Sequence, residues 1–292
     1  MNRINQFALA VVVLISLSTS LWGQTYTFET VTDPADPTFT QLLGINNAGT
    51  IAGYYGSGGT AHPNKGFVLE LPSTFTTENF PGSAQTQVTG IDSKGDTCGF
   101  YIDSTGVNHG FRRNGTKFGK IDHPGTIFNH SLGRNDLEQV VGFYNDTAGI
   151  SHAYFSDTDG GVYADLILPK SVSAVATGIN NSQWVSGFYT NTSGVTRGFL
   201  LQGGTFKIVD FPASTLTMVL GLNNKDQVVG SYIDASGVTH GFVLNLSTQT
   251  YTTIDDPNGI GSTVANGIND SGKIVGFYVN ATGNTAGFVA TP

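Results

Sequence analysis

The twelve-residue segment GINNAGTIAGYY, which begins at Gly44, returns five more times along the chain and strongly limits the choice of fold. Successive copies start 46, 43, 45, 43 and 46 residues apart, and a second glycine always follows nine positions after the first. The first glycines of the six copies are Gly44, Gly90, Gly133, Gly178, Gly221 and Gly267. A period near 45 residues is typical of a β-propeller, in which each repeat forms one blade.

Each copy predicts four short strands. The first leads into the GIN segment, the second ends in GFY, and the third begins at a Gly-aromatic pair such as Gly66-Phe67. The fourth runs from an aromatic residue to a proline six positions later, as from Phe75 to Pro81. Turn residues such as Asn114-Gly115 supply the positive φ angles that tight hairpins require. The chain is therefore expected to be all-β.

One strand is displaced in the sequence. The last copy ends at GFVATP without a fourth strand, whereas an extra one, from Phe28 to Pro34, precedes the first copy. An N-terminal strand that completes the last blade closes the ring and removes an unpaired sheet edge. We therefore predict a single domain over 24–292, a six-bladed β-propeller with four strands per blade. The alternative is an open solenoid, which has no use for a displaced strand.

The recurring residues are explained as scaffold. The first glycine of each copy is expected on the innermost strand, where neighbouring backbones approach the axis and a side chain does not fit. The following Asn-Asn or Asn-Asp pair is turn chemistry. The aromatic residues of GFY are expected to pack between neighbouring blades.

The N-terminus has the pattern of a secretory signal. One positive charge at Arg3 precedes an apolar run from Phe7 to Leu17 and then small polar residues. A run of this length is shorter than the roughly 20 residues of a membrane span. We expect residues 1–23 to be removed, with cleavage after Ser20 or Gly23, and the protein to be secreted without membrane insertion.

Charge and cysteine content narrow the possible partners. Without Arg3, the only charged residue of the signal, the chain has 12 basic and 21 acidic residues. This balance argues against nucleic acid and anionic membranes as partners. The single cysteine, Cys98, excludes an internal disulfide and is expected to be a small buried residue. We expect a monomer that packing and hydrogen bonds hold together.

A triplet after the GFY segment supplies a family resemblance. It reads His109-Gly110-Phe111, His152-Ala153-Tyr154 and His240-Gly241-Phe242. Together with GIN[ND] and GFY, this pattern resembles the HAF-type extracellular repeats of bacteria over the whole mature chain. The other three copies depart from it with Lys65, Arg197 and Ala286. The resemblance implies secretion and a propeller-like fold, and it implies no established catalytic residue.

The three histidines occupy equivalent positions in different blades and should lie too far apart to share a metal. Acidic residues near the end of the fourth strand accompany basic residues at the triplet position in the same repeat. The expected pairs are His109 with Asp122, Arg197 with Asp210 and His240 with Asp255. We therefore predict cross-strand ion pairs rather than a metal site.

Motifs for catalysis and cofactors are absent. The sequence contains no G-x-S-x-G, H-E-x-x-H, C-x-x-C, P-loop or dinucleotide-binding fingerprint. Asp157, Asp159 and Gly160 resemble the start of a calcium loop, but the later ligands are missing, so a hairpin turn is the better interpretation. We predict no cofactor and no metal.

Candidate binding residues are sought where one copy departs from the others. The segment from His123 to Arg134 contains His123, Phe128 and His130, and Arg134 replaces an Ile or Leu of the other copies. The alternative is structural, with His123 capping a turn and Arg134 pairing with Asp136 or Glu138. Trp184, at a turn position, is expected to be exposed and able to stack on a sugar ring or a partner protein.

These features favour a binding module that recognises a glycan or an extracellular protein with the loops around the channel. The alternatives are an enzyme acting on extracellular polysaccharide, which would need a carboxylate pair or a His-Tyr-Arg cluster, and a purely structural surface component. The chain has only four Glu, and none follows a proline of the fourth strand.

Overall fold

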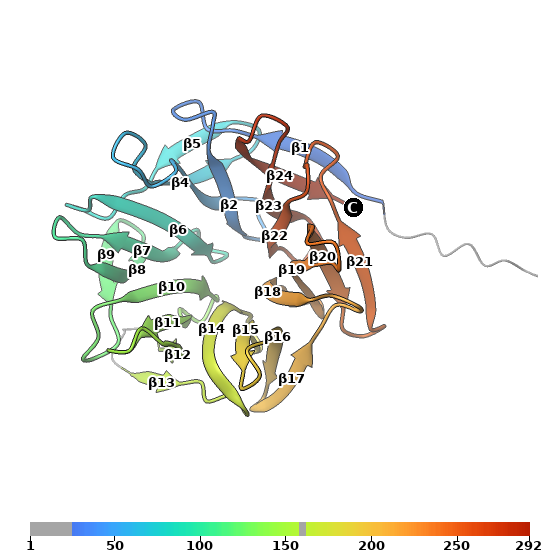
Figure 1. Cartoon of the computed structure of the whole chain (residues 1–292). Helices are drawn as coiled ribbons and strands as arrows, with labels where there is room; N and C mark the ends of the chain where they lie inside the picture. Colours follow the sequence, from blue (N-terminus) through green and yellow to red (C-terminus); the bar gives the residue numbers. More distant parts are fainter. Residues whose placement is uncertain (1–24, 158–161) are drawn as a thin grey trace, which may run out of the picture.

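The computed structural model describes residues 25–157 and 162–292, and every regular element in them is a β-strand. Six four-stranded antiparallel sheets stand around a central axis as the blades of a β-propeller (Figure 1). This confirms the predicted fold. The predicted signal segment and the Asp159-Gly160 turn lie outside the described residues.

The strands run from the axis outwards in chain order within each of blades 1 to 5. Blades 1 and 2 consist of β2 (Thr40–Ile45), β3 (Ile51–Tyr55), β4 (Lys65–Glu70), β5 (Thr74–Thr77), β6 (Gln85–Ile91), β7 (Thr97–Ile102), β8 (Asn108–Asn114) and β9 (Lys117–Ile121). Blades 3 and 4 consist of β10 (Asn129–Arg134), β11 (Val140–Asn145), β12 (Ser151–Ser156), β13 (Tyr163–Asp165), β14 (Ser171–Ile179), β15 (Val185–Asn191), β16 (Thr196–Gln202) and β17 (Thr205–Val209). Blade 5 consists of β18 (Leu216–Leu222), β19 (Gln227–Ile233), β20 (Thr239–Asn245) and β21 (Thr250–Ile254).

Blade 6 combines both ends of the described chain. It contains β22 (Thr263–Ile268), β23 (Ile274–Val279), β24 (Thr285–Thr291) and, as its outermost strand, β1 (Thr27–Val31). β1 pairs antiparallel with β24 in a register that runs from Thr27 opposite Thr291 to Val31 opposite Gly287. The displaced strand therefore closes the ring, as its place in the sequence predicts.

All six innermost strands contain the same irregularity. Their pairing with the second strand shifts at the residue before the first glycine of each repeat, for example between Leu42 and Gly44. Such a β-bulge bends the strand and leaves one residue outside the ladder. The glycine that follows lies against the next blade: a Cβ at Gly221 would meet Asn266 O at 2.5 Å and Gly267 Cα at 3.2 Å. The predicted close approach of backbones near the axis is confirmed.

The core lies between neighbouring blades. Three positions meet at each interface: the end of the outermost strand of one blade, the start of the second strand of the next, and the residue opposite it on the third strand. At the interface of blades 4 and 5 these are Val209, Val228 and Leu244, which belong to one buried cluster. The equivalent positions meet at each interface around the ring and join the blades without a disulfide, and Cys98 is buried as expected.

The two faces of the ring differ in the connections that they carry. We call the face where the innermost strands begin the linker face, because the segments between blades cross it; an example is residues 122–128. The opposite face, where the innermost strands end, is the turn face. It carries the tight turns that follow Asn46, Asp92, Asn135, Asn180, Asn223 and Asn269.

Candidate functional site at the central channel

The central channel contains a cavity of about 210 Å³ toward the turn face. All six blades contribute the same stretch to it, namely the end of the innermost strand and the start of the turn that follows. Three levels of side chains line the cavity. We call them the bulge ring, the inner ring and the outer ring, in order along the chain.

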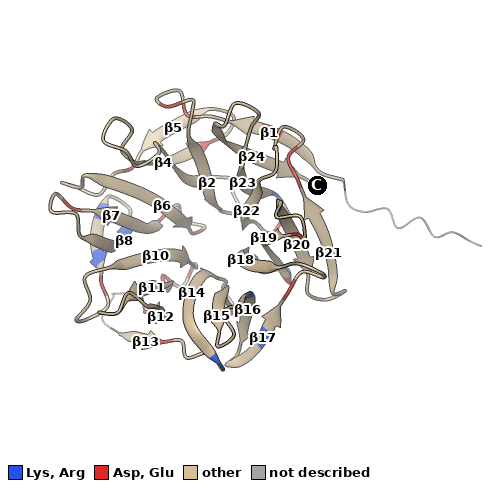
Figure 2. Ribbon diagram, viewed as in Figure 1, with Lys and Arg blue, Asp and Glu red and all other residues tan. Residues whose placement is uncertain are grey.

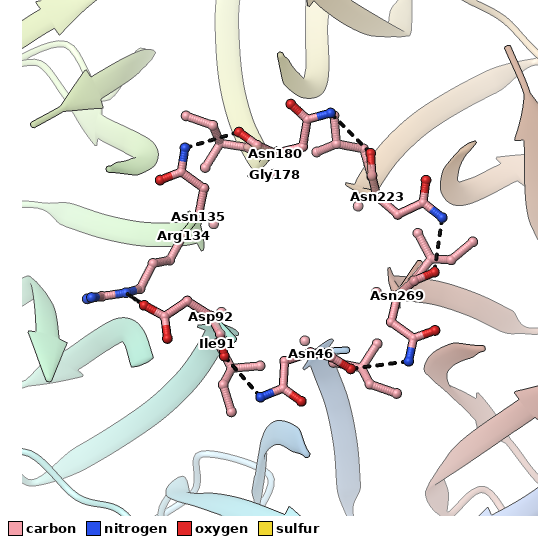
Figure 3. A pocket seen from close by; sticks show the side chains of 18 of the residues that line it. Asn46, Ile91, Asp92, Arg134, Asn135, Gly178, Asn180, Asn223 and Asn269 are labelled. Atoms are coloured by element: carbon pink, nitrogen blue, oxygen red, sulfur yellow. Dashed lines mark hydrogen bonds and ion pairs between the residues drawn. The ribbon is translucent and has the colours of Figure 1, made fainter. Parts of the chain in front are cut away.

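The inner ring joins neighbouring blades through side-chain amides (Figure 3). Each asparagine Nδ2 donates a hydrogen bond of 2.9–3.1 Å to the backbone carbonyl of the equivalent residue in the next blade. The ring consists of Asn46, Asp92, Asn135, Asn180, Asn223 and Asn269. Each side-chain oxygen accepts from backbone N–H groups of its own turn, as Asn46 does from Ala48 and Thr50. The recurring asparagines are therefore scaffold, as predicted.

Blades 2 and 3 depart from this pattern together. Asp92 replaces an asparagine and has no amide to donate, so it cannot make the bond to the carbonyl of the next blade. Arg134 replaces an Ile or Leu, and its Nε donates to Asp92 Oδ2 at 2.8 Å (Figure 3). Both side chains are fully buried, and Arg134 Nη1 also donates to Asn114 Oδ1 at 2.9 Å. An ion pair thus replaces the amide link at this interface.

The outer ring forms the rim of the cavity. It consists of Asn47, Ser93, Asp136, Asn181, Asn224 and Asp270. Among the described residues, five of these backbone N–H groups donate to the side chain of the next member, with distances of 2.7–3.0 Å. The carboxylates of Asp136 and Asp270, three blades apart, also accept amide N–H groups, as Asp136 does from Asn181 at 2.7 Å.

The bulge ring lies deepest in the cavity and alternates between apolar and polar residues. It reads Leu43, Thr89, Leu132, Thr177, Leu220 and Asn266 around the axis. The polar members are turned toward the next blade: Thr89 and Thr177 each donate to a backbone carbonyl there at 2.9 Å, and so does Asn266. The three leucines are half-exposed and give the cavity an apolar wall. The alternation is visible in the sequence, in the residue before the first glycine of each repeat, but it was not among the predicted site features.

The site offers hydrogen bonds and an apolar surface, and one of its carboxylates, Asp136, is a poor proton donor. Burial raises the pKa of Asp136, but hydrogen bonds from the Ser93 backbone and the Asn181 amide outweigh it and leave the pKa below its usual value. A general acid that protonates a leaving group needs a raised pKa instead. Asp136 is therefore suited to accept hydrogen bonds rather than to act as a general acid.

The structure separates the five residues proposed from the sequence. Arg134 lies at the turn-face end of β10, whereas His123, Phe128 and His130 lie at or before its other end. The partners of Arg134 are Asp92 and Asn114, and Asp96 Oδ2 is 3.7 Å from its Nη2, in place of the expected Asp136 or Glu138. The partner Asp92 is 42 residues away, about one repeat.

His123 takes the place of an aromatic residue in the scaffold. Its ring stacks on Tyr144 with centroids 3.9 Å apart. Phe80 stacks on Tyr101 at 3.8 Å and Phe211 on Tyr232 at 3.6 Å in the equivalent places. Packing thus accounts for His123, although its side chain also lies 3.3 Å from Asp165.

Phe128 and His130 form a half-exposed cluster with Phe100 and Phe143 on the linker face. The His130 ring stacks on Phe100 at 3.5 Å, and its Nε2 lies 3.2 Å from Asn108 Oδ1. Burial lowers the pKa of His130 to about 3, so the ring is neutral at physiological pH. This cluster does not line the channel cavity.

Trp184 differs from its expected exposure. The indole is half-buried and packs against the cluster between blades 4 and 5 that contains Leu200 and Val228. It contributes to the core because the residue extends from the turn over the neighbouring apolar side chains.

The predicted cross-strand pairs are present. His109 lies 2.7 Å from Asp122, Arg197 lies 3.0 Å from Asp210, and His240 lies 2.7 Å from Asp255. Among the residues that the structure describes, no group of three His, Cys, Asp or Glu side chains could hold a metal ion.

No protein-family model and no curated protein matches the chain. Solved structures similar to it include a TolB protein from Agrobacterium tumefaciens, at 11% identity and a TM-score of 0.63, covering 88% of this chain and 91% of that one. A lectin from Aleuria aurantia in complex with Fucα1-6GlcNAc is 11% identical with a TM-score of 0.55, covering 86% and 91% of the two chains. An oligogalacturonate lyase in complex with manganese is 11% identical with a TM-score of 0.52, covering 91% and 96%.

Identities this low show a shared fold and nothing more specific. The similar structures cover most of both chains, so the likeness concerns the complete ring rather than single blades. None of the described segments is a helix with the length and hydrophobicity of a membrane span. The comparisons thus place the chain among β-propellers.

Proposed function

We propose that this protein is a secreted binding module that holds a neutral glycan in the central channel at the turn face. The observation that carries the proposal is the cavity of about 210 Å³, in which an apolar wall of leucines lies beneath a rim of amides and carboxylates. Amide and carboxylate groups hydrogen-bond sugar hydroxyls, and the leucine side chains pack against the C–H faces of a sugar ring. The lowered pKa of Asp136 argues against this carboxyl as the general acid of a hydrolase.

Two further observations agree with this proposal. The names of two similar structures, a lectin bound to Fucα1-6GlcNAc and an oligogalacturonate lyase, contain saccharides, so the fold is compatible with this ligand class. The signal-like N-terminus and the resemblance to HAF-type repeats support a location outside the cell, where such glycans are found.

A thermal-shift screen of residues 24–292 against neutral hexasaccharides of glucose, xylose and mannose tests the proposal. A ligand at 100 times its Kd stabilises the folded state by ~2.7 kcal/mol, which raises the Tm measurably. Leu132→Trp and Leu220→Trp should fill the cavity and reduce the shift. Ile208→Trp, at a site 58% exposed on β17, is the matched control and should leave the shift intact. Shifts that are equal in all variants would exclude the channel as the binding site.

The linker-face cluster is a second candidate surface, because it contains Phe128 and His130 of the sequence prediction. Its exposed neighbour Ile127 and the neutral His130 ring suit an apolar contact with an extracellular protein. Loss of partner binding in Phe128→Ala, with glycan binding unchanged, would assign protein recognition to this face.

A further inference from the structure

The interface between blades 1 and 2 is the one that breaks the apolar pattern of the ring. Its three contact positions hold Glu78, Thr97 and Arg113. At the other five interfaces the position of Glu78 holds Val31, Ile121, Leu166, Val209 and Ile254, and that of Thr97 holds Ile51, Val140, Val185, Val228 and Ile274. The position of Arg113 holds Leu69, Ser156, Leu201, Leu244 and Ala290. Three replacements thus meet at one place.

The three side chains form a connected polar cluster. Arg113 Nε lies 2.7 Å from Glu78 Oε2, and the Thr97 hydroxyl donates to Glu78 Oε1. The Arg113 guanidinium also donates to the backbone carbonyls of Gly95 and Gly115. The Glu78 side chain is only 6% exposed, whereas that of Arg113 is 22% exposed.

Folding does not account for this cluster. Five interfaces of the same ring close with aliphatic or small residues at these positions, and a buried ion pair is commonly no more stable than well-packed apolar residues. Burial raises the pKa of Glu78, although Thr97 and Arg113 act against the increase. The carboxylate is therefore held in a place that disfavours its charge, which is common at functional sites.

A groove of about 670 Å³ lies next to the cluster and opens on the turn face between the two blades. Hydroxyl and amide side chains dominate its lining, which includes Thr50, Thr76, Thr77, Asn79, Ser93 and Thr116. Phe118 and Val68 add an apolar surface. Glu78 and Glu70 are balanced by Arg113 and Lys94, so the lining has no net charge. Figure 2 shows basic and acidic segments side by side around β8.

The hydrogen-bonding capacity of the cluster indicates the ligand. A carboxylate has about four acceptor sites, and Thr97 and Arg113 occupy two of those of Glu78. The remaining sites suit hydroxyl donors. An anion is disfavoured, because the charge of Arg113 is paired with Glu78, its two Nη atoms already donate to the carbonyls of Gly95 and Gly115, and two carboxylates line the groove.

We propose that the groove between blades 1 and 2 is a second ligand site, which binds a neutral oligosaccharide with Glu78 accepting from its hydroxyl groups and Phe118 packing on a sugar ring. The site is separate from the channel, although both open on the turn face. Its existence does not depend on the channel binding a glycan.

The test uses a variant that makes this interface resemble the others. Glu78→Ile, Thr97→Val and Arg113→Leu together introduce residue types that the equivalent positions already hold. Calorimetric titration with the neutral hexasaccharides, in wild type and in the channel-filled Leu132→Trp protein, separates the two sites. We expect the channel-filled protein to retain one binding event, and the triple replacement in that background to weaken it at least tenfold while the Tm stays equal or rises.

Two further variants keep the cluster intact. Thr116→Trp should obstruct the groove, and Phe118→Ala should weaken binding several-fold, both without disturbing the ion pair. The proposal is overturned if the channel-filled protein binds none of the neutral hexasaccharides. It is also overturned if the triple replacement leaves binding unchanged, whatever its Tm, because the cluster then takes no part in binding.

Discussion

Two interfaces of the same ring solve one packing problem with different chemistry. Between blades 4 and 5, Val209, Val228 and Leu244 form an apolar contact. Between blades 1 and 2, Glu78, Thr97 and Arg113 occupy the same positions with a buried ion pair. Since the blades are related by a repeat of about 45 residues, the comparison indicates that the fold requires volume at these positions and tolerates charge only when it is paired.

The inner ring also contains a charged residue that is paired with a charge from the next blade. Asn180 joins blades 4 and 5 through an amide, whereas Asp92 requires Arg134 from the next blade. A polar replacement in one repeat is matched by a second replacement about one repeat away. Matched departures of this kind identify the interfaces that differ from the others.

The largest expected effect comes from removing one member of the ion pair between blades 1 and 2, which leaves the other charge without a partner. Glu78→Ala removes the carboxylate and leaves the Arg113 guanidinium without its ion-pair partner, so we expect the free energy of unfolding to fall by ~3–5 kcal/mol. Urea denaturation measures this free energy. Val209→Ala is the matched control at the apolar interface. A loss in Glu78→Ala no greater than in Val209→Ala would contradict the paired-charge account.

A smaller effect is expected when the charge of blade 2 is introduced elsewhere. Asn180→Asp removes the donor of the 3.1 Å bond to the Asn223 carbonyl and places a carboxylate without a cationic partner in the inner ring. We expect a loss of about 1–3 kcal/mol. Adding Leu222→Arg, at the position of Arg134 in blade 5, should restore much of it. Equal stability of the single and double variants would mean that an Asp–Arg pair cannot replace the amide link between blades 4 and 5.

Gly→Ala substitutions should cost more stability on the channel wall than on the surface of the ring. Gly221→Ala places a Cβ at 2.5 Å from Asn266 O, so strand β18 and its neighbour must move apart. We expect a loss of ~1–3 kcal/mol. Gly59→Ala, where no atom lies within 4 Å of the added Cβ, should be nearly neutral in the same denaturation assay. Similar losses in both would contradict the close approach of the inner strands.

The smallest effect concerns pH and the linker-face pairs. Burial lowers the pKa of His240, but Asp255 and Asp234 outweigh it and raise the pKa above its usual value. The ion pair therefore stabilises the folded state fully below the pKa of His240 in the unfolded chain, ~6.5. This stabilisation is lost as the pH rises through the pKa of His240 in the folded state. Because the groups are partly exposed, we expect His240→Gln to cost less than ~1 kcal/mol at pH 5 and almost nothing at pH 8. An equal cost at both pH values would contradict the charged pair.

Much of the fold was predictable because its determinants are local and repeated. The period, the glycines and the displaced strand at Phe28 predicted a closed ring of six blades. The pairs of His109 and His240 with aspartates followed from the equivalent positions of these residues in the aligned repeats. These features need no knowledge of how blades face one another.

The site was less predictable because it depends on contacts between repeats. Arg134 was recognised as a departure, but its partner Asp92 belongs to another blade. Glu78 and Arg113 are 35 positions apart, and their relation appears only when the outermost strand of one blade is placed against the next. Both pairs would have been found by comparing, repeat by repeat, the sequence positions that contact each other across the interface between neighbouring blades.

The most direct test of the proposed function is a crystal structure of residues 24–292 with the hexasaccharide that produces the largest thermal shift. The account predicts a sugar ring in the central channel, over Leu43, Leu132 and Leu220, with its hydroxyl groups on the rim of Asp136 and Asp270. A sugar bound only on the linker face, beside Phe128 and His130, would contradict binding in the central channel. The binding site would then lie in the segments between blades.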